Sequence, residues 1–172
     1  MSEREFQPLG CAVVTVSDTR SPETDRSGDL VAQRLEQAGH RLADRRIVKD
    51  ERAELEEAFR ALMADPEVAV VISTGGTGIT GRDVTPEAAD AVYTKAIPGF
   101  GELFRWLSYE EIGPSTIQSR AQAGLAGTTL MFNLPGSSGA CRLAMDALII
   151  PQLDYRTRPC NFAEMMPRFS ET

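Results

Sequence analysis

The chain has 172 residues, of which 42% are hydrophobic, and this length and composition suit one domain with a single core. Its 18 Lys and Arg residues against 25 Asp and Glu residues give a net charge of −7, which argues against DNA or RNA as the main partner. The N-terminal MSEREFQPLG lacks the apolar run of a signal peptide, and no stretch has the length of a membrane span, so we expect a cytoplasmic protein that does not bind membranes.

Cysteine and histidine are too few to support several common kinds of site. Cys11, Cys141 and Cys160 are odd in number and widely spaced, which indicates neither a disulfide framework nor a Cys-x-x-Cys zinc site. The single histidine, His40, follows Gly39 at a predicted helix end, and we expect it to be a solvent-facing turn residue. A Ser-His-Asp triad or a multi-histidine metal site would depend on that residue alone, so carboxylates, backbone amides or a metal ion are the expected chemistry.

The first half of the chain alternates strand and helix patterns. Residues 10–18 form a β-branched run that leads into a polar loop, and the apolar spacing of residues 31–38 predicts a helix that stops at a glycine. An alternating strand is possible over residues 40–50. Residues 55–63 follow the i, i+3, i+4 spacing of an amphipathic helix, and residues 68–73 form a strand that is apolar on both faces.

The second half continues the alternation. Thr85 followed by Pro86 fits an N-cap and first helical position, which predicts a helix from Thr85 to Tyr93. The remaining predicted elements are helices over 99–113 and 115–127, a buried strand over 128–133, and a helix over 137–150 that Pro151 closes.

Alternating strands and helices predict an α/β fold of three layers, with a mainly parallel sheet and helices on both faces. We expect one domain over residues 1–172, with short flexible ends at about 1–8 and 165–172. Ligands of such sheets bind beyond the carboxyl ends of the strands, so the loops that follow the strands are the places to search.

One of these loops resembles a dinucleotide-binding turn. In STGGTGITGRDVTPEA, residues 73–88, Gly76-x-Gly78-x-x-Gly81 has the required spacing. The context differs, because Gly81 precedes the predicted helix and the acidic residue about twenty positions on, Glu102, opens a helix instead of ending a strand. We therefore reject an NAD site, and the Gly-Lys-Ser or Gly-Lys-Thr of a P-loop is absent.

The same loop has the composition of a phosphate-binding nest. Gly75, Gly76 and Gly78 allow backbone N–H groups to converge on an anion, and Thr74 and Thr77 add hydroxyl donors. A tight turn that only needs positive φ is the structural alternative, but four glycines within residues 75–81 favour a ligand loop.

A second loop, NLPGSSGA at 133–140, also joins a buried strand to a helix. Gly136, Ser137, Ser138 and Gly139 lie where a helix N-terminus offers free amides, and Ser138 could equally cap that helix. Two such loops at one sheet edge predict a ligand with several phosphates, or two phosphorylated ligands side by side.

Two aspartates accompany these loops. Asp83 follows the first glycine loop and Asp50 ends the second strand, and a polyphosphate beside carboxylates requires a hard cation, so we expect Mg²⁺. An N-cap role remains open for Asp50, and an ordinary surface pair of Arg82 with Asp83 is the other alternative.

Several segments in register resemble the molybdenum cofactor biosynthesis proteins of the MoaB/Mog type, and the N-terminal domain of gephyrin is similar. The matching segments are VVISTGGTGITGRDVTPEA, IPGFGELFR, SRAQAG and NLPGSSGACRLAMDALIIPQLD, and the terminal PQLDYRTRPCNF is most similar to the MoaB branch. The resemblance implies a molybdopterin-binding fold and, as in the Mog-like members, adenylylation of molybdopterin by Mg-ATP with release of pyrophosphate.

The resemblance also implies roles for individual residues. Nucleotide phosphates would be held by Thr74, Gly75, Gly76, Thr77 and Gly78. Catalysis and Mg²⁺ binding would fall to Asp50 and Asp83. Molybdopterin would be faced by Glu102, Ser119, Arg120, Pro135, Gly136, Ser137 and Ser138.

The same resemblance leaves two rival functions open and implies a homo-oligomer. A carrier would hold molybdopterin or a nucleotide without turnover and would not need both aspartates; a scaffold role would use further domains. Family members form trimers or dimers of trimers, so a homo-oligomer is expected. Trp106, Leu107 and Ile112 could contribute to its interface or belong to the core.

Overall fold

The computed structural model describes residues 4–171, which contain a six-stranded sheet in the order β2-β1-β3-β6-β5-β4. The first four of these strands are parallel, whereas β5 runs antiparallel to both β6 and β4. The strands are β1 (Gly10–Val16), β2 (Arg41–Val48), β3 (Val70–Thr74), β4 (Lys95–Ala96), β5 (Gln122–Ala126) and β6 (Thr129–Leu134). The predicted mainly parallel α/β sheet is confirmed.

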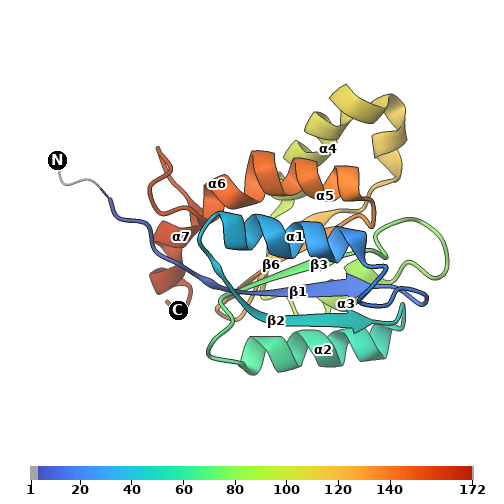
Figure 1. The fold of residues 1–172 in the computed structure, drawn as a ribbon, viewed down its shortest axis with the longest axis horizontal. Coiled ribbons are helices and arrows are strands. Elements are labelled where there is room, and N and C mark those ends of the chain that lie inside the picture. Colours follow the sequence, from blue (N-terminus) through green and yellow to red (C-terminus); the bar gives the residue numbers. More distant parts are fainter. Residues whose placement is uncertain (1–3, 172) are drawn as a thin grey trace.

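Helices cover both faces of the sheet, as Figure 1 shows for α1 and α5 on one side and α2 on the other. One face packs against α1, α4 and the helical run that begins with α5, and the opposite face packs against α2 and α3. The helices are α1 (Arg26–Gln37), α2 (Arg52–Ala64), α3 (Thr85–Asp90), α4 (Pro98–Ile112), α5 (Ser138–Ala144), α6 (Ile150–Leu153) and α7 (Phe162–Met165). Short 3-10 helices are η1 (Gly113–Gln118) and η3 (Met166–Arg168), and η2 (Met145–Ile149) is a π-helix.

The central strands are buried along their full length. Every residue of β1, β3 and β6 is buried, which is why their sequences are mostly apolar and lack the alternation of a half-buried strand. The edge strand β2 is half-buried, and its charged residues reflect that position. Because β1, β3 and β6 are adjacent and parallel, their carboxyl ends lie side by side at one edge of the sheet.

The helix predicted over 115–127 is wrong. The segment forms η1 and then strand β5, which pairs antiparallel with β6. Small residues determine this packing, because a Cβ added at Gly124 would lie 2.6 Å from the ring of Tyr93. The close approach of the ring needs a glycine in a strand, and the tertiary contact overrides the local helical pattern.

Two predicted helix boundaries also differ. The helix expected to stop at Pro151 instead continues through η2 into α6. The π-helix η2 precedes Pro151 and places it in the first turn of α6. Proline is tolerated in a first turn because its missing N–H costs no hydrogen bond there. The helix expected from Thr85 to Tyr93 ends at Asp90, and its N-cap is Val84. The Thr85 hydroxyl does not cap the helix but donates to the Gly75 carbonyl oxygen.

His40 is buried, with 5% of its surface exposed, so the prediction of a solvent-facing turn residue is wrong. Its Nδ1 accepts a hydrogen bond from the Leu9 N–H at 3.2 Å, and its ring lies 5.1 Å from that of Phe6. The segment before β1 therefore covers the turn between α1 and β2. Because Leu9 and His40 are 31 residues apart, the local sequence pattern around His40 could not predict this contact.

Near both ends, Arg4 pairs with Glu164 at 2.5 Å. The predicted flexible ends remain a prediction, and residues 1–3 and 172 of those ends lie outside the described residues. Between residues 4 and 171, no helix combines the length and apolar character needed to cross a membrane.

Candidate functional site

A cavity of about 790 Å³ opens beyond the carboxyl ends of β1, β3 and β6. Three loops line it: the β1–α1 loop (17–25), the loop from Thr74 to Asp83, here called the glycine loop, and Pro135–Ser138, here called the serine loop. Of the residues predicted as site residues, it brings together Asp50, Thr74, Gly75, Gly76, Thr77, Gly78, Asp83, Ser119, Pro135, Gly136, Ser137 and Ser138. The segments that supply them are far apart in the sequence.

Two glycines allow the glycine loop to turn where it leaves β3. Gly75 has φ of 105°, and a Cβ there would lie 2.3 Å from the Val16 carbonyl oxygen. Gly76 has φ of 66°, and a Cβ there would lie 2.4 Å from Thr85 Oγ1. Any side chain would clash with backbone or with a buried hydroxyl, so the path of this loop requires glycine at both positions.

The carbonyl groups of the glycine loop are held by donors from the protein. Thr85 donates from Oγ1 to Gly75 O at 2.9 Å and from its N–H to Gly76 O at 3.0 Å. Arg120 donates from Nε to Gly78 O at 2.7 Å. These acceptors are already bonded within the protein, and the Gly75 N–H is bonded to Leu134 O at 2.9 Å. The N–H groups of Gly76 and Thr77 remain to bind an anion.

The serine loop shows the same pattern and lies against the glycine loop. Pro135 O accepts from Thr74 Oγ1 at 2.9 Å, and Gly136 O accepts from Ser27 Oγ at 2.7 Å. A Cβ at Gly136 would lie 3.4 Å from the Gly75 Cα, so the two backbones are nearly in contact. The two predicted anion loops thus form one continuous wall of the cavity.

The two aspartates differ in their electrostatic surroundings. Partial burial alone raises the pKa of Asp83, but hydrogen bonds from the Thr80 hydroxyl and N–H, at 2.6 and 2.8 Å, outweigh it and hold the pKa below its ordinary value. Partial burial, and next the negative charge of Asp18, raises the pKa of Asp50. Asp50 is therefore the carboxylate whose charge is least compensated in the cavity.

The structural alternatives for these aspartates are wrong. The N-cap of α2 is Glu51, so Asp50 does not have that role. Arg82 does not pair with Asp83, because its guanidinium bonds Asp18 at 2.7 Å and Glu51 at 2.9 Å.

Asp50 and Asp83 line one cavity but do not form a metal cage. In the part of the chain that the structure describes, no group of three or more His, Cys, Asp or Glu side chains could hold a metal ion by itself. Two carboxylates facing a phosphate-sized nest nevertheless fit Mg²⁺, which takes one or two carboxylates and completes its shell with water and phosphate oxygens.

Two predicted site residues, Glu102 and Arg120, do not line the main cavity. With Ser119, which lines both, they border a second cavity of about 390 Å³ between α4 and β5. The Arg120 guanidinium is engaged by Gly78 O, by Asp83 O at 2.8 Å and by the Glu87 carboxylate. In this arrangement Arg120 braces the glycine loop.

Sequence reasoning missed the β1–α1 loop and the start of α1. Thr15, Arg20, Asp25, Arg26 and Ser27 all line the main cavity, yet residues 19–29 were interpreted only as a polar turn. The signal that could have revealed them is an aspartate directly before a helical pattern, since Asp25 caps α1 by accepting from the Gly28 N–H at 2.9 Å.

The apolar residues considered for an interface are not part of the core. Trp106 is 68% exposed and Ile112 is 54% exposed, whereas Leu107 is half-buried. Tyr109, near the end of α4, and Ile117, in η1, are also exposed, and this part of the chain projects from the rest of the molecule in Figure 1.

The chain matches a known domain family and known proteins over most of its length. Residues 12–155 match the family model described as a probable molybdopterin binding domain. The chain is 49% identical over 158 residues to molybdenum cofactor biosynthesis protein B of Escherichia coli K12, covering 92% of this chain and 93% of the relative. It is 52% identical over 149 residues to the protein of that name from Bacillus subtilis 168, covering 86% and 88%.

Solved structures show the same fold. A crystal structure of molybdenum cofactor biosynthesis protein B superposes with a TM-score of 0.88 at 43% identity, covering 98% of this chain and 100% of the other. The tungsten cofactor synthesizing protein MoaB of Pyrococcus furiosus superposes with a TM-score of 0.77 at 31% identity, covering 96% and 99%.

Proposed function

This chain belongs to the MoaB/Mog family of molybdopterin-binding domains, and on that premise we propose that it adenylylates molybdopterin with Mg-ATP and releases pyrophosphate. The observation that carries the proposal is that carbonyl groups of both loops are bonded within the protein, which leaves the N–H groups of Gly76 and Thr77 and those of the serine loop for an anion. A nucleotide and a pterin phosphate together supply the several phosphates that such a wall would accommodate.

The chemistry needs positioning more than covalent assistance. A terminal phosphate oxygen of molybdopterin attacks the α-phosphorus of ATP, a P–O bond forms, and the bond to the β-phosphate breaks as pyrophosphate leaves with the electron pair. In the proposal the Thr74–Gly78 segment holds the nucleotide phosphates, and its unengaged amides stabilise the charge that develops in transfer. Mg²⁺, when bound, would neutralise charge on the transferring and leaving phosphates.

Asp50 and Asp83 would hold the ion, and their states fit that role. The lowered pKa of Asp83 keeps it ionised, and the hydrogen bonds from Thr80 fix its orientation. Asp50 carries the less compensated charge, which a bound cation would relieve. The serine loop and Ser119 would face the pterin phosphate, Glu102 would face the pterin across the smaller cavity, and Arg120 would act by holding the glycine loop.

The test is release of pyrophosphate by purified protein given molybdopterin, ATP and Mg²⁺. We expect release that requires all three and falls by at least about a hundredfold in Asp83→Asn and Asp50→Asn, because each loses a proposed ligand of the ion. Asp65→Asn is the matched control, since Asp65 lies outside the cavity and its oxygen only accepts from the Glu67 N–H.

Binding measured in parallel separates the enzyme from a carrier. Molybdopterin that binds at micromolar concentration without pyrophosphate release, and with equal affinity in both aspartate variants, would contradict the adenylyltransferase and favour the carrier.

We also propose that the chain forms a homo-oligomer, a trimer or a dimer of trimers, through the exposed apolar residues around Trp106. Trp106, Tyr109 and Ile112 are exposed at three-residue spacing along α4, and exposed aromatic and aliphatic side chains are typical of protein interfaces. Trp106→Glu should lower the molar mass measured by light scattering, whereas Glu67→Lys, at the opposite end of the sheet strands, should not. An unchanged mass in Trp106→Glu would exclude this surface.

A further inference from the structure

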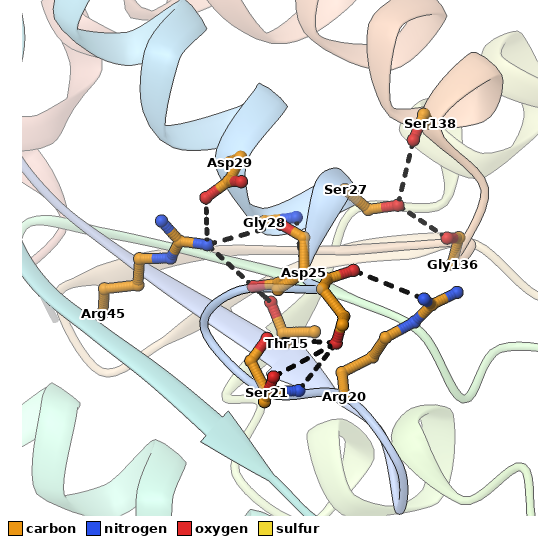
Figure 2. Close-up of polar contacts among 11 residues, drawn as sticks. Thr15, Arg20, Ser21, Asp25, Ser27, Gly28, Asp29, Arg45, Gly136 and Ser138 are labelled. Carbon is orange, nitrogen blue, oxygen red and sulfur yellow. Dashed lines mark hydrogen bonds and ion pairs between the residues drawn. The ribbon is translucent and has the colours of Figure 1, made fainter.

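Ser27, in the first turn of α1, makes a contact with the serine loop 109 residues away in the sequence. Its hydroxyl donates to the Gly136 carbonyl oxygen at 2.7 Å and lies 3.4 Å from Ser138 Oγ. Figure 2 shows this contact, with Ser27 placed between the start of α1 and the loop that carries Gly136 and Ser138.

The direction of these hydrogen bonds is set by chemistry. A carbonyl oxygen can only accept, so the Ser27 hydroxyl proton is committed to Gly136. Ser138 must then be the donor to Ser27 Oγ. In a trans peptide the N–H points opposite to the preceding carbonyl, so the Ser137 N–H is directed away from Ser27.

Ser27 is itself held by a buried network. Asp25, which is 2% exposed, accepts from Thr15 Oγ1 at 2.7 Å and from Arg45 at 2.9 Å, and it caps α1 through the Gly28 N–H. Figure 2 shows these groups converging on Asp25 from β1, β2 and α1. The first turn of α1 is therefore attached to two strands of the sheet and gives Ser27 a fixed base.

Close packing at Gly28 strengthens this attachment. A Cβ added there would lie 2.1 Å from Asp25 Oδ2 and 2.4 Å from Thr15 Oγ1. The helix can approach the Asp25–Thr15 pair this closely because position 28 has no side chain.

We propose that Ser27 is a positioning residue that fixes the orientation of the Gly136–Ser137 peptide for the binding of a phosphate group. A carbonyl oxygen turned toward a phosphate would repel it, and the Ser27 hydrogen bond stabilises the opposite orientation. Arg20 and Arg26 line the same cavity beside Ser27 and add positive charge to it. The inference rests on the proposed function, because it assumes that the serine loop takes a phosphate.

Inorganic pyrophosphate is the probe, and its affinity is measured by titration calorimetry. Ser27→Ala should weaken binding by about fivefold, the size expected for loss of one hydrogen bond, and Ser27→Thr should restore it to within about twofold of the original chain. Ser21→Ala is the matched control, because it removes a hydroxyl from the β1–α1 loop just before Ser27, and that hydroxyl contacts Thr24 and not the serine loop. Urea unfolding of each variant checks that the fold is kept, and Ser27→Cys serves if Ser27→Ala does not fold.

A second readout without ligand separates positioning from direct contact. In the ligand-free protein, Ser27→Ala should shift the NMR resonances of the Gly136 carbonyl carbon and the Ser137 amide, whereas Ser21→Ala should leave both unchanged. Weaker pyrophosphate binding without these shifts would mean that Ser27 contacts the ligand itself and would overturn the positioning role.

The remaining outcomes separate the two proposals. Pyrophosphate that binds the original chain and Ser27→Ala equally would overturn the inference about Ser27 and leave the phosphate site intact. Pyrophosphate that does not bind the original chain would overturn the phosphate site, and the inference with it.

Discussion

Arg120 donates from Nε to the Gly78 carbonyl oxygen at 2.7 Å and so connects the start of β5 to the glycine loop. The same residue donates from its backbone N–H to Thr77 O at 3.0 Å and from its guanidinium to Asp83 O at 2.8 Å. One arginine thus holds three carbonyls of a loop whose conformation no regular element determines.

Replacing Arg120 should loosen that loop. Arg120→Gln is expected to lower the free energy of unfolding by about 2 kcal/mol, because hydrogen bonds from a charged donor are lost, and to weaken pyrophosphate binding by about tenfold. Urea unfolding and calorimetry measure the two effects. Arg60→Gln, which breaks only a surface pair with Glu56, should change neither by a measurable amount. Full pyrophosphate affinity in Arg120→Gln would show that the loop keeps its shape without the brace.

Thr85 should matter for the same reason at the other end of the loop. Thr85→Val keeps the shape of a fully buried side chain but leaves the Gly75 carbonyl without its donor, at a cost of about 1 to 3 kcal/mol in stability. Pyrophosphate affinity should fall with it. Thr94→Val is a matched control, because Thr94 also donates to a carbonyl, Leu125 O at 2.8 Å, but away from the cavity. Equal affinity losses in the two variants would point to general destabilisation.

Asp50 and Asp83 should affect stability in opposite directions. Burial and Asp18 raise the pKa of Asp50, so its ionisation disfavours the folded state, and Asp50→Asn should increase the free energy of unfolding at pH 7. Hydrogen bonds lower the pKa of Asp83 despite its burial, so its contribution is present above the ordinary aspartate pKa, and Asp83→Asn should decrease stability at pH 7. Both differences should shrink below about pH 4, where aspartates protonate. Urea unfolding from about pH 3 to pH 8 checks this, and a loss of stability at pH 7 in Asp50→Asn would contradict it.

His40 should make the fold sensitive to mild acid. Burial lowers the pKa of His40, against the opposing charge of Asp154, so neutral His40 contributes stability above about pH 6.5 that is lost as pH falls through its lowered pKa. Asn at this position can still accept from the Leu9 N–H but cannot be protonated. His40→Asn should therefore lose less unfolding free energy between pH 8 and pH 5 than the original chain, as measured by urea unfolding. A parallel decline in both proteins would assign the acid sensitivity to other groups.

The sequence by itself determined the strands that are buried on both faces and the helices with a clear apolar stripe. Val70–Thr74 and Thr129–Leu134 were found because burial leaves a continuous apolar run, and Leu55, Phe59 and Leu62 because helical periodicity repeats on one face. The two loops were found because clustered glycine and serine residues directly after buried strands favour a ligand loop. These signals are local, and each is complete within about ten residues.

Only the tertiary structure decided β5, the burial of His40 and the role of Arg120. In each case the partner is distant in sequence: the Tyr93 ring at Gly124, the Leu9 N–H at His40, and the Gly78 carbonyl at Arg120. The start of α1, with Asp25 and Ser27, depends in the same way on contacts with β2 and the serine loop. Local composition shows which residues can donate or accept a hydrogen bond, but the identity of the partner is set by how the sheet and helices pack.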